Sequence, residues 1–314
     1  MKERFIFVFL DGVGIGEASE TNPFYAAKAK YLPFYNGALQ LPDGTPVKAI
    51  DALLGVEGLP QSATGQTSLY TGENIPKLIG AHKGSYPNRV MRQMILKKNI
   101  LTLLKRKGLD AVFVNAYPMH SDLFTEEHVR IDESGEFFFS DQFPPLFKRR
   151  ISTTSCIICA ASQKPFSEID IEAERSIFHD YNNQWLNEKG LNLPLFSPEK
   201  AGEILSNALM QRDFILYEYF QTDVFGHRES FQRQVQLISD LDRLLAELFR
   251  RLDPTKHTML LTSDHGNIED SSNRSHTLNP VPLITWGKHS EQLRCAINDL
   301  TQVTPAIVNL MGSQ

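Results

Sequence analysis

The sequence predicts an α/β protein in which a mostly parallel sheet is flanked by helices and carries a small inserted cap. Three observations support this prediction: short apolar runs recur along the chain, helical patterns lie between them, and the middle of the chain has a different texture. Alternating strands and helices are typical of parallel sheets. The 314 residues are enough for one large domain, or for a core with a smaller insertion.

The expected strands are short runs that are apolar at almost every position. The first, residues 5–10, ends directly in Asp11-Gly12, and it is too short for a signal peptide or a membrane segment. A continuous apolar run of this length is typical of a parallel strand that is buried on both faces. Further strands of the same type are expected at residues 111–115, 214–220, 258–262 and 282–286.

Two helices are predicted from the spacing of their apolar residues. In residues 99–107 three apolar side chains share one face, and Gly108 can adopt the left-handed conformation that ends many helices. A longer helix is expected from about residue 230 to 251, because leucines recur there at steps of four and three before Pro254. The two apolar faces consist of Ile100, Leu103 and Leu104, and of Leu237, Leu241, Leu244 and Leu248.

The middle of the chain lacks the alternation of strands and helices. Residues 133–138 are acidic and aromatic, and residues 143–145 form a Phe-Pro-Pro turn. We therefore expect residues 1–117 and 199–314 to form the core, and residues 118–198 to form an inserted cap.

Composition excludes some classes of protein. The chain has 32 Lys and Arg against 37 Asp and Glu, a net charge of -5, and no basic stripe that would bind a nucleic-acid backbone. Its three cysteines cannot form a disulfide framework and are typical of a reducing compartment, so we expect a cytoplasmic protein without a membrane segment. Cys156 and Cys159 lie in an apolar run and are expected to be buried rather than to bind a metal.

Four short segments rich in Asp and His carry the candidate chemistry. In the first, Asp11 directly follows the opening strand, and Gly12, Gly14 and Gly16 allow the backbone to turn sharply beside it. This spacing differs from the Gly-x-Gly-x-x-Gly fingerprint of dinucleotide-binding proteins. Taken alone, Asp11 could equally cap a helix.

The other three segments lie past an apolar strand or in a loop of the core. Asp223 and His227 are four residues apart after the strand at 214–220, so both could reach one ion. Asp264 and His265 follow the next strand, and the glycine after them permits the bend that would bring both to one site. His276 lies in a loop that prolines restrict.

Together these segments supply three Asp and three His. Such mixed oxygen and nitrogen ligands indicate Zn, Mn or Fe rather than Mg or Ca alone. A metal pair needs a group to activate, and Ser62 in the polar segment 58–69 is the candidate. Coordination to a divalent ion lowers the pKa of a serine hydroxyl and makes its oxygen a nucleophile. The alternative is a polar loop that caps a helix.

In their order and spacing these motifs resemble those of the alkaline phosphatase superfamily, specifically the metalloenzyme branch that contains phosphopentomutase and cofactor-independent phosphoglycerate mutase. Asp11-Gly12 is similar to the opening metal aspartate, and residues 61–66, Gln-Ser-Ala-Thr-Gly-Gln, are similar to the nucleophile loop. The resemblance implies an alkaline phosphatase-like core with two divalent ions, Mn or Zn. It implies one ion held by Asp223, His227 and His276, and a second held by Asp11, Asp264, His265 and the Ser62 oxygen.

The resemblance also implies a reaction, in which Ser62 attacks phosphorus in line and forms a phosphoserine. The substrate would be a small-molecule phosphate ester. Gln66 stands where both mutases have a His, and the expected cap is shorter than theirs, which favours a phosphatase or phosphodiesterase. The alternatives are a phosphomutase, which would be an isomerase, and a metal-binding module without turnover.

Four basic residues are candidate contacts for a phosphate or substrate. Arg228 and Arg274 stand next to predicted metal ligands in the sequence, and arginine binds oxyanions through two parallel hydrogen bonds. His82 and Arg89 are the other two candidates. For each of the four, a surface ion pair is the alternative.

Overall fold

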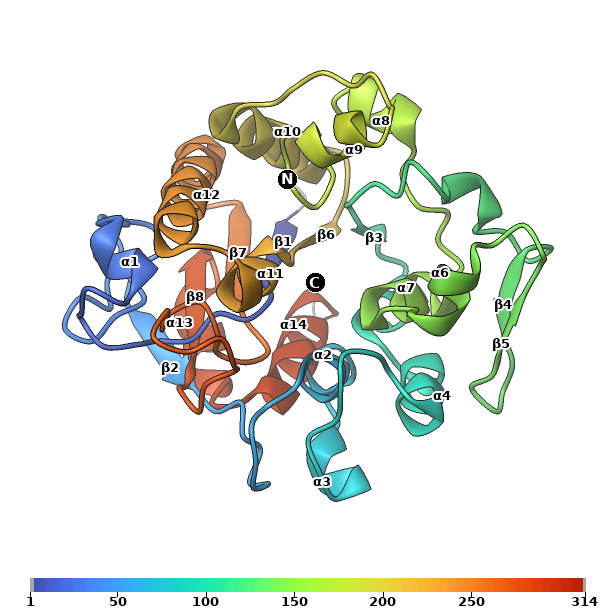
Figure 1. Cartoon of the computed structure of the whole chain (residues 1–314), viewed down its shortest axis with the longest axis horizontal. Helices are drawn as coiled ribbons and strands as arrows, with labels where there is room; N and C mark the ends of the chain where they lie inside the picture. Colours follow the sequence, from blue (N-terminus) through green and yellow to red (C-terminus); the bar gives the residue numbers. More distant parts are fainter. Residues whose placement is uncertain (1–2, 313–314) are drawn as a thin grey trace.

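A six-stranded sheet in the order β2-β8-β7-β1-β6-β3 forms the centre of the fold in the computed structural model, which describes residues 3–312 (Figure 1). β1 pairs in parallel with β6 and β7, and β6 pairs in parallel with β3. β8 is antiparallel to both of its neighbours, so it alone runs against the other five strands. The strands are β1 (Arg4–Leu10), β2 (Val47–Ile50), β3 (Ala111–Phe113), β6 (Phe214–Tyr219), β7 (His257–Thr262) and β8 (Val281–Gly287).

Alternate side chains of β1 enter two separate hydrophobic clusters, one on each face of the sheet. Ile6, Val8 and Leu10 pack in the cluster that contains α10 (Pro198–Met210) and α12 (Phe231–Arg251). These two helices lie side by side (Figure 1). The phenylalanines of β1 enter the other cluster, together with α2 (Ser62–Thr71), α5 (Ile100–Arg106), α7 (Thr153–Ala160) and α14 (Val303–Met311).

The predicted fold class is confirmed, with strands and helices near their expected positions. The helix expected at residues 99–107 is α5, where Asn99 accepts a hydrogen bond from the amide of Thr102 and Gly108 has a φ of +78°. The expectation of parallel strands was wrong for β8, which has the predicted position but the opposite direction. β2 was not predicted, because it has only four residues and pairs only with β8.

Residues 118–198 contain several short elements, of which the β4–β5 hairpin lies outside the main sheet (Figure 1). Phe143, Cys156 and Ile157 nevertheless belong to the same cluster as the phenylalanines of β1, and Leu186 belongs to the opposite cluster. The division into core and cap stays a prediction. The elements are η1 (Ser121–Leu123), β4 (Val129–Ile131), β5 (Phe137–Phe139), α6 (Pro145–Arg149), α7 (Thr153–Ala160), α8 (Glu168–Glu172) and α9 (Gln184–Glu188).

The remaining helices join the strands or cover the sheet. Of the two cysteines in the apolar run, Cys156 is buried and Cys159 is partly buried, as expected. Within residues 3–312 no helix is long and apolar enough to cross a membrane. The remaining helices are α1 (Pro23–Ala26), α3 (Ile75–Ile79), α4 (Arg89–Lys97), α11 (Gln221–Arg228), α13 (Ser290–Ala296) and η2 (Leu300–Gln302).

Candidate metal centre

The four Asp- and His-rich segments meet at one edge of the sheet. Asp11 directly follows β1, Asp223 lies in the first turn of α11 after β6, and Asp264 follows β7. Because β8 is antiparallel, its first residue lies at the edge where the parallel strands end. His276, which precedes β8, therefore reaches the same site as the ligands that follow the parallel strands.

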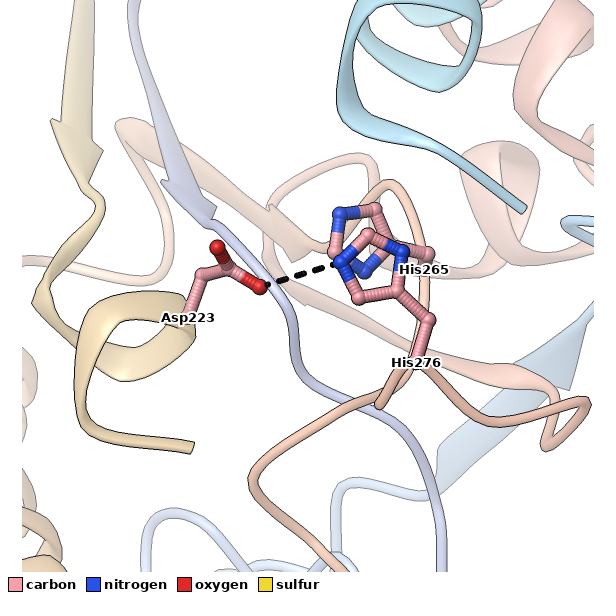
Figure 2. A group of neighbouring side chains, drawn as sticks. All are labelled: Asp223, His265 and His276. Carbon is pink, nitrogen blue, oxygen red and sulfur yellow. Dashed lines mark ion pairs between the residues drawn. The ribbon is translucent and has the colours of Figure 1, made fainter. Parts of the chain in front are cut away.

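The side chains of the first predicted ligand group lie close together. The Nε2 atoms of His227 and His276 lie 3.4 and 3.5 Å from Oδ1 of Asp223, and 3.1 Å from each other. Figure 2 shows the Asp223 carboxyl directed towards the imidazole rings of His265 and His276. Oxygen and nitrogen atoms this close together could share one ion.

The second predicted group lies beside the first. Possible ligand atoms of Asp11, Asp264 and His265 all lie within 4.8 Å of one another, and His265 Nε2 is 3.4 Å from Asp11 Oδ1. The rings of His265 and His276 stack with centroids 3.8 Å apart, so the two groups adjoin. The bend after β7 therefore brings the adjacent Asp264 and His265 to one site.

Backbone carbonyls fix the orientation of two of the histidines. Nδ1 of His227 donates to the carbonyl of Arg274 at 2.7 Å, and Nδ1 of His276 donates to the carbonyl of Pro60 at 2.7 Å. A carbonyl can only accept, so Nδ1 carries a proton, and loss of a second proton from Nε2 would make the Nε2 lone pair available to a metal.

Ser62 is the first residue of α2, and its Oγ lies 3.0 Å from Nε2 of His265. Gln61 precedes it as the N-cap residue, and Ser62 itself does not cap the helix. The hydroxyls of Thr64 and Ser68 donate to carbonyls of the same segment, so they are engaged in local structure. Ser62 thus presents its hydroxyl to the second ligand group at the N-terminus of a helix.

The electrostatics of the centre suit a bound cation. Burial raises the pKa of Asp11 well above its usual range, and the charges of Asp264, Asp223 and Glu218 raise it further. Burial also acts to raise the pKa of Asp223, but hydrogen bonds from His227 and His276 hold it well below its usual range. Oδ1 of Asp11 is buried and accepts no hydrogen bond from any described residue. Because a divalent cation would satisfy this oxygen and offset the buried charge, the residues fit such an ion.

Gln66 contacts two of the candidate ligands, which was not predicted from the sequence. Its Nε2 donates to Oδ2 of Asp11 at 3.2 Å and to Oδ2 of Asp264 at 3.1 Å. The signal was available, because Gln66 lies four residues after Ser62 and so on the same face of the helix.

Glu218 was missed as well. It is the only acidic residue of β6, it is 6% exposed, and its Oε1 accepts from the hydroxyl of Thr154 at 2.9 Å. Asn115 holds the backbone at this position by bonding both its amide and its carbonyl. Burial, together with the charge of Asp264, raises the pKa of Glu218 to about 7 despite the Thr154 hydrogen bond. Glu218 could have been identified from the sequence as the single acidic residue in an otherwise apolar strand.

The four candidate substrate contacts differ in their surroundings. Arg228 and Arg274 are exposed next to ligand-bearing segments, and neither forms an ion pair with a residue in the described part of the chain. His82 contacts the carbonyl of Val56 through Nε2 at 3.2 Å. Arg89, by contrast, donates to the carbonyl of Ser134 and lies 3.6 Å from Glu136, so its side chain links α4 to the turn between β4 and β5.

Known proteins resemble this chain in part of its sequence and in its fold. A model of the Metalloenzyme superfamily matches residues 193–314, the part that contains five of the six predicted Asp and His ligands. The alkaline phosphatase from the Antarctic bacterium TAB5 has the same fold, with a TM-score of 0.56 and 11% identity over all of both chains. The fold is therefore that of this alkaline phosphatase, and residues 193–314 are similar to the Metalloenzyme superfamily.

Curated relatives that match part of the chain include phosphoglycerate mutases. The 2,3-bisphosphoglycerate-independent enzyme of Ehrlichia canis is 25% identical over 220 residues, which is 61% of this chain and 44% of that protein. The enzyme of Pseudomonas paraeruginosa is 32% identical over 124 residues, which is 37% of this chain and 24% of that protein. The aligned regions therefore span less than half the length of either relative.

Proposed function

We propose that the protein is a two-metal phosphoryl-transfer enzyme that acts on small phosphate esters, as a phosphatase or phosphodiesterase, through a phosphoserine at Ser62. The observation that carries this proposal is the position of the Ser62 hydroxyl, 3.0 Å from His265 where two Asp and His groups adjoin. A hydroxyl at this point would be bound by the same ion as His265.

Asp223, His227 and His276 would hold one divalent ion. Asp11, Asp264 and His265 with Ser62 would hold the other. Bound ions would lower the pKa of the Ser62 hydroxyl and offset charge on the phosphoryl oxygens. Zn and Mn both suit this ligand set.

Residues of the chain itself would position the substrate. Ser62 is the first residue of α2, so the positive end of the helix dipole would favour a phosphoryl group bound there. The exposed guanidinium groups of Arg228 and Arg274 are available for the remaining oxygens. His82 is a further candidate, whereas the contacts of Arg89 with the β4–β5 turn argue against a substrate role.

A phosphomutase is the second candidate, and the names of the curated relatives favour it. Against it stands Gln66, which contacts Asp11 and Asp264 at a position where the mutases have a His. A metal-binding module without turnover is the third candidate. The placement of Ser62 beside the ligands argues against it, because metal binding alone does not need that hydroxyl.

We also propose a cytoplasmic location and no nucleic-acid partner. The three cysteines are all free, which suits a reducing compartment. The net charge of -5 gives no electrostatic basis for binding a nucleic-acid backbone.

The test is a panel of substrates offered to the metal-free protein after addition of Mn²⁺, Zn²⁺ or Mg²⁺. We expect metal-dependent release of the alcohol from an aryl phosphate or a phosphodiester, and loss of this activity in Ser62→Ala. Isomerisation of a phosphoglycerate or sugar phosphate without release of phosphate would favour the mutase. Full activity of Ser62→Ala would refute both enzymatic candidates.

A further inference from the structure

The carboxylate of Glu269 lies buried among the segments that carry the metal ligands, with an exposure of 1%. Its Oε2 accepts from the amides of Gly14 at 2.8 Å and Asn267 at 2.7 Å. Its Oε1 accepts from the Asn279 side-chain amide at 3.0 Å and from the hydroxyl of Thr277. A carboxylate has about four acceptor positions, so one side chain fills its whole capacity here.

The four donors come from three different ligand-bearing segments. Gly14 is three residues after Asp11, Asn267 is two residues after His265, and Thr277 is next to His276. Asn267 extends the network to the fourth segment, because its Nδ2 donates to Oδ1 of Asp223 at 2.7 Å and to its carbonyl at 3.2 Å. A single carboxylate thus connects all four segments of the metal centre.

Glycines make room for this network. A Cβ at Gly14 or at Gly266 would lie 2.3 Å from Oε1 of Glu269, and a Cβ at Gly226 would lie 2.5 Å from Oδ1 of Asn267. No side chain tolerates contacts this short. Gly14 therefore leaves room for the Glu269 carboxylate. This explains a glycine after Asp11 without any binding of a nucleotide.

We propose that Glu269 is a positioning residue that sets the metal affinity of the centre, an inference that rests on the proposed metal-dependent function. Three of its donors are N–H groups, and no described Lys, Arg or His pairs with it, so it holds an uncompensated negative charge behind the ligands. That charge attracts cations, and the four hydrogen bonds fix the ligand segments before an ion arrives.

The test measures the affinity of the folded protein for Zn²⁺ and Mn²⁺ by competition with a chelator. Glu269→Ala should weaken binding by about 10- to 100-fold, the usual effect of losing a group that orients ligands. Glu269→Gln should weaken it less. Its oxygen can accept from both amides, while the Thr277 hydroxyl and the Asn279 amide can turn to face its nitrogen.

Asp242→Ala is the matched control. The Asp242 carboxylate also accepts three backbone amides, from Lys30, Tyr31 and Leu32, but these lie in a loop against α12 without a predicted ligand. Asp242→Ala should lower the free energy of unfolding and leave metal affinity unchanged.

Three results would overturn the inference: wild-type affinity in folded Glu269→Ala, equal losses of affinity in Glu269→Ala and Asp242→Ala, or a wild-type protein that binds neither ion. If Glu269→Ala does not fold, Glu269→Gln takes its place. Wild-type metal affinity of Glu269→Gln at both predicted metal sites would then overturn the inference. A wild-type protein that binds ions but turns over no ester would remove the proposed function, and the expected loss of affinity would still support the role of Glu269.

Discussion

In the metal-free protein, Glu218 should make stability fall as pH rises. Its folded-state pKa is about 7, against a usual value of 4.5. Below pH 4.5 the carboxyl is protonated in both states, and between pH 4.5 and 7 the folded state binds more protons than the unfolded state. The free energy of unfolding therefore decreases with pH across this window and levels off above it.

The size of this effect follows from the difference between the two pKa values. The folded-state pKa of about 7 exceeds the usual value of 4.5 by about 2.5 pKa units. Each unit corresponds to about 1.4 kcal/mol, so the free energy of unfolding should fall by about 3 kcal/mol across this pH window. Glu218→Gln should remove it, because an amide does not ionise and its oxygen can still accept from Thr154. At pH 8 the metal-free variant should be more stable than the wild type by up to about 3 kcal/mol, whereas at pH 4.5 the two should be similar.

The assay is urea unfolding at a series of pH values with a chelator present, followed by far-UV circular dichroism. Parallel pH profiles for the two proteins between pH 4.5 and 8 would refute the reasoning, because they would show that Glu218 titrates normally.

Two further changes test the packing and the support of the ligands. Gln66→Leu removes the donor to Asp11 and Asp264, so it should weaken metal binding, measured by chelator competition. It should also lower the free energy of unfolding of the metal-free protein by about 1 to 3 kcal/mol, measured by urea unfolding. Unchanged values of both quantities would exclude a supporting role for Gln66. Gly202→Ala would place a Cβ 2.5 Å from the carbonyl oxygen of Leu244, so it should destabilise the protein by about 1 to 3 kcal/mol. In most helices the same substitution stabilises by about 1 kcal/mol. Asn207→Ala, at an exposed position of the same helix, is the control. Stabilisation by Gly202→Ala would mean that α10 and α12 can separate at little cost.

The metal segments could be predicted because local rules govern them. Polar residues directly after buried strands gather at the edge where parallel strands end, which places Asp11, Asp223 and Asp264 without further information. The direction of β8 could not be predicted, since an apolar strand looks the same in either direction. His276 was predicted as a ligand from its loop and from its resemblance to a known motif, rather than from strand order.

The supporting residues were harder to find because their partners are distant in the sequence. The Gly14 amide that bonds Glu269 is 255 positions away, and no local pattern marks such a pair. Gln66 and Glu218 did leave local signals, as a residue one turn after Ser62 and as the only acid in an apolar strand. Both signals were readable in the sequence, but their partners were not.

The central claim is that Ser62 becomes phosphorylated when both ligand groups hold metal ions. The most direct test mixes the metal-loaded protein with an aryl phosphate, quenches the mixture in acid within the first turnover, and determines the mass of the peptide that contains Ser62. The account predicts that this peptide gains one phosphoryl group, that the gain needs the divalent ion, and that Ser62→Ala abolishes it. Turnover with the peptide unmodified at every quench time, or with phosphate on another residue, would contradict the account.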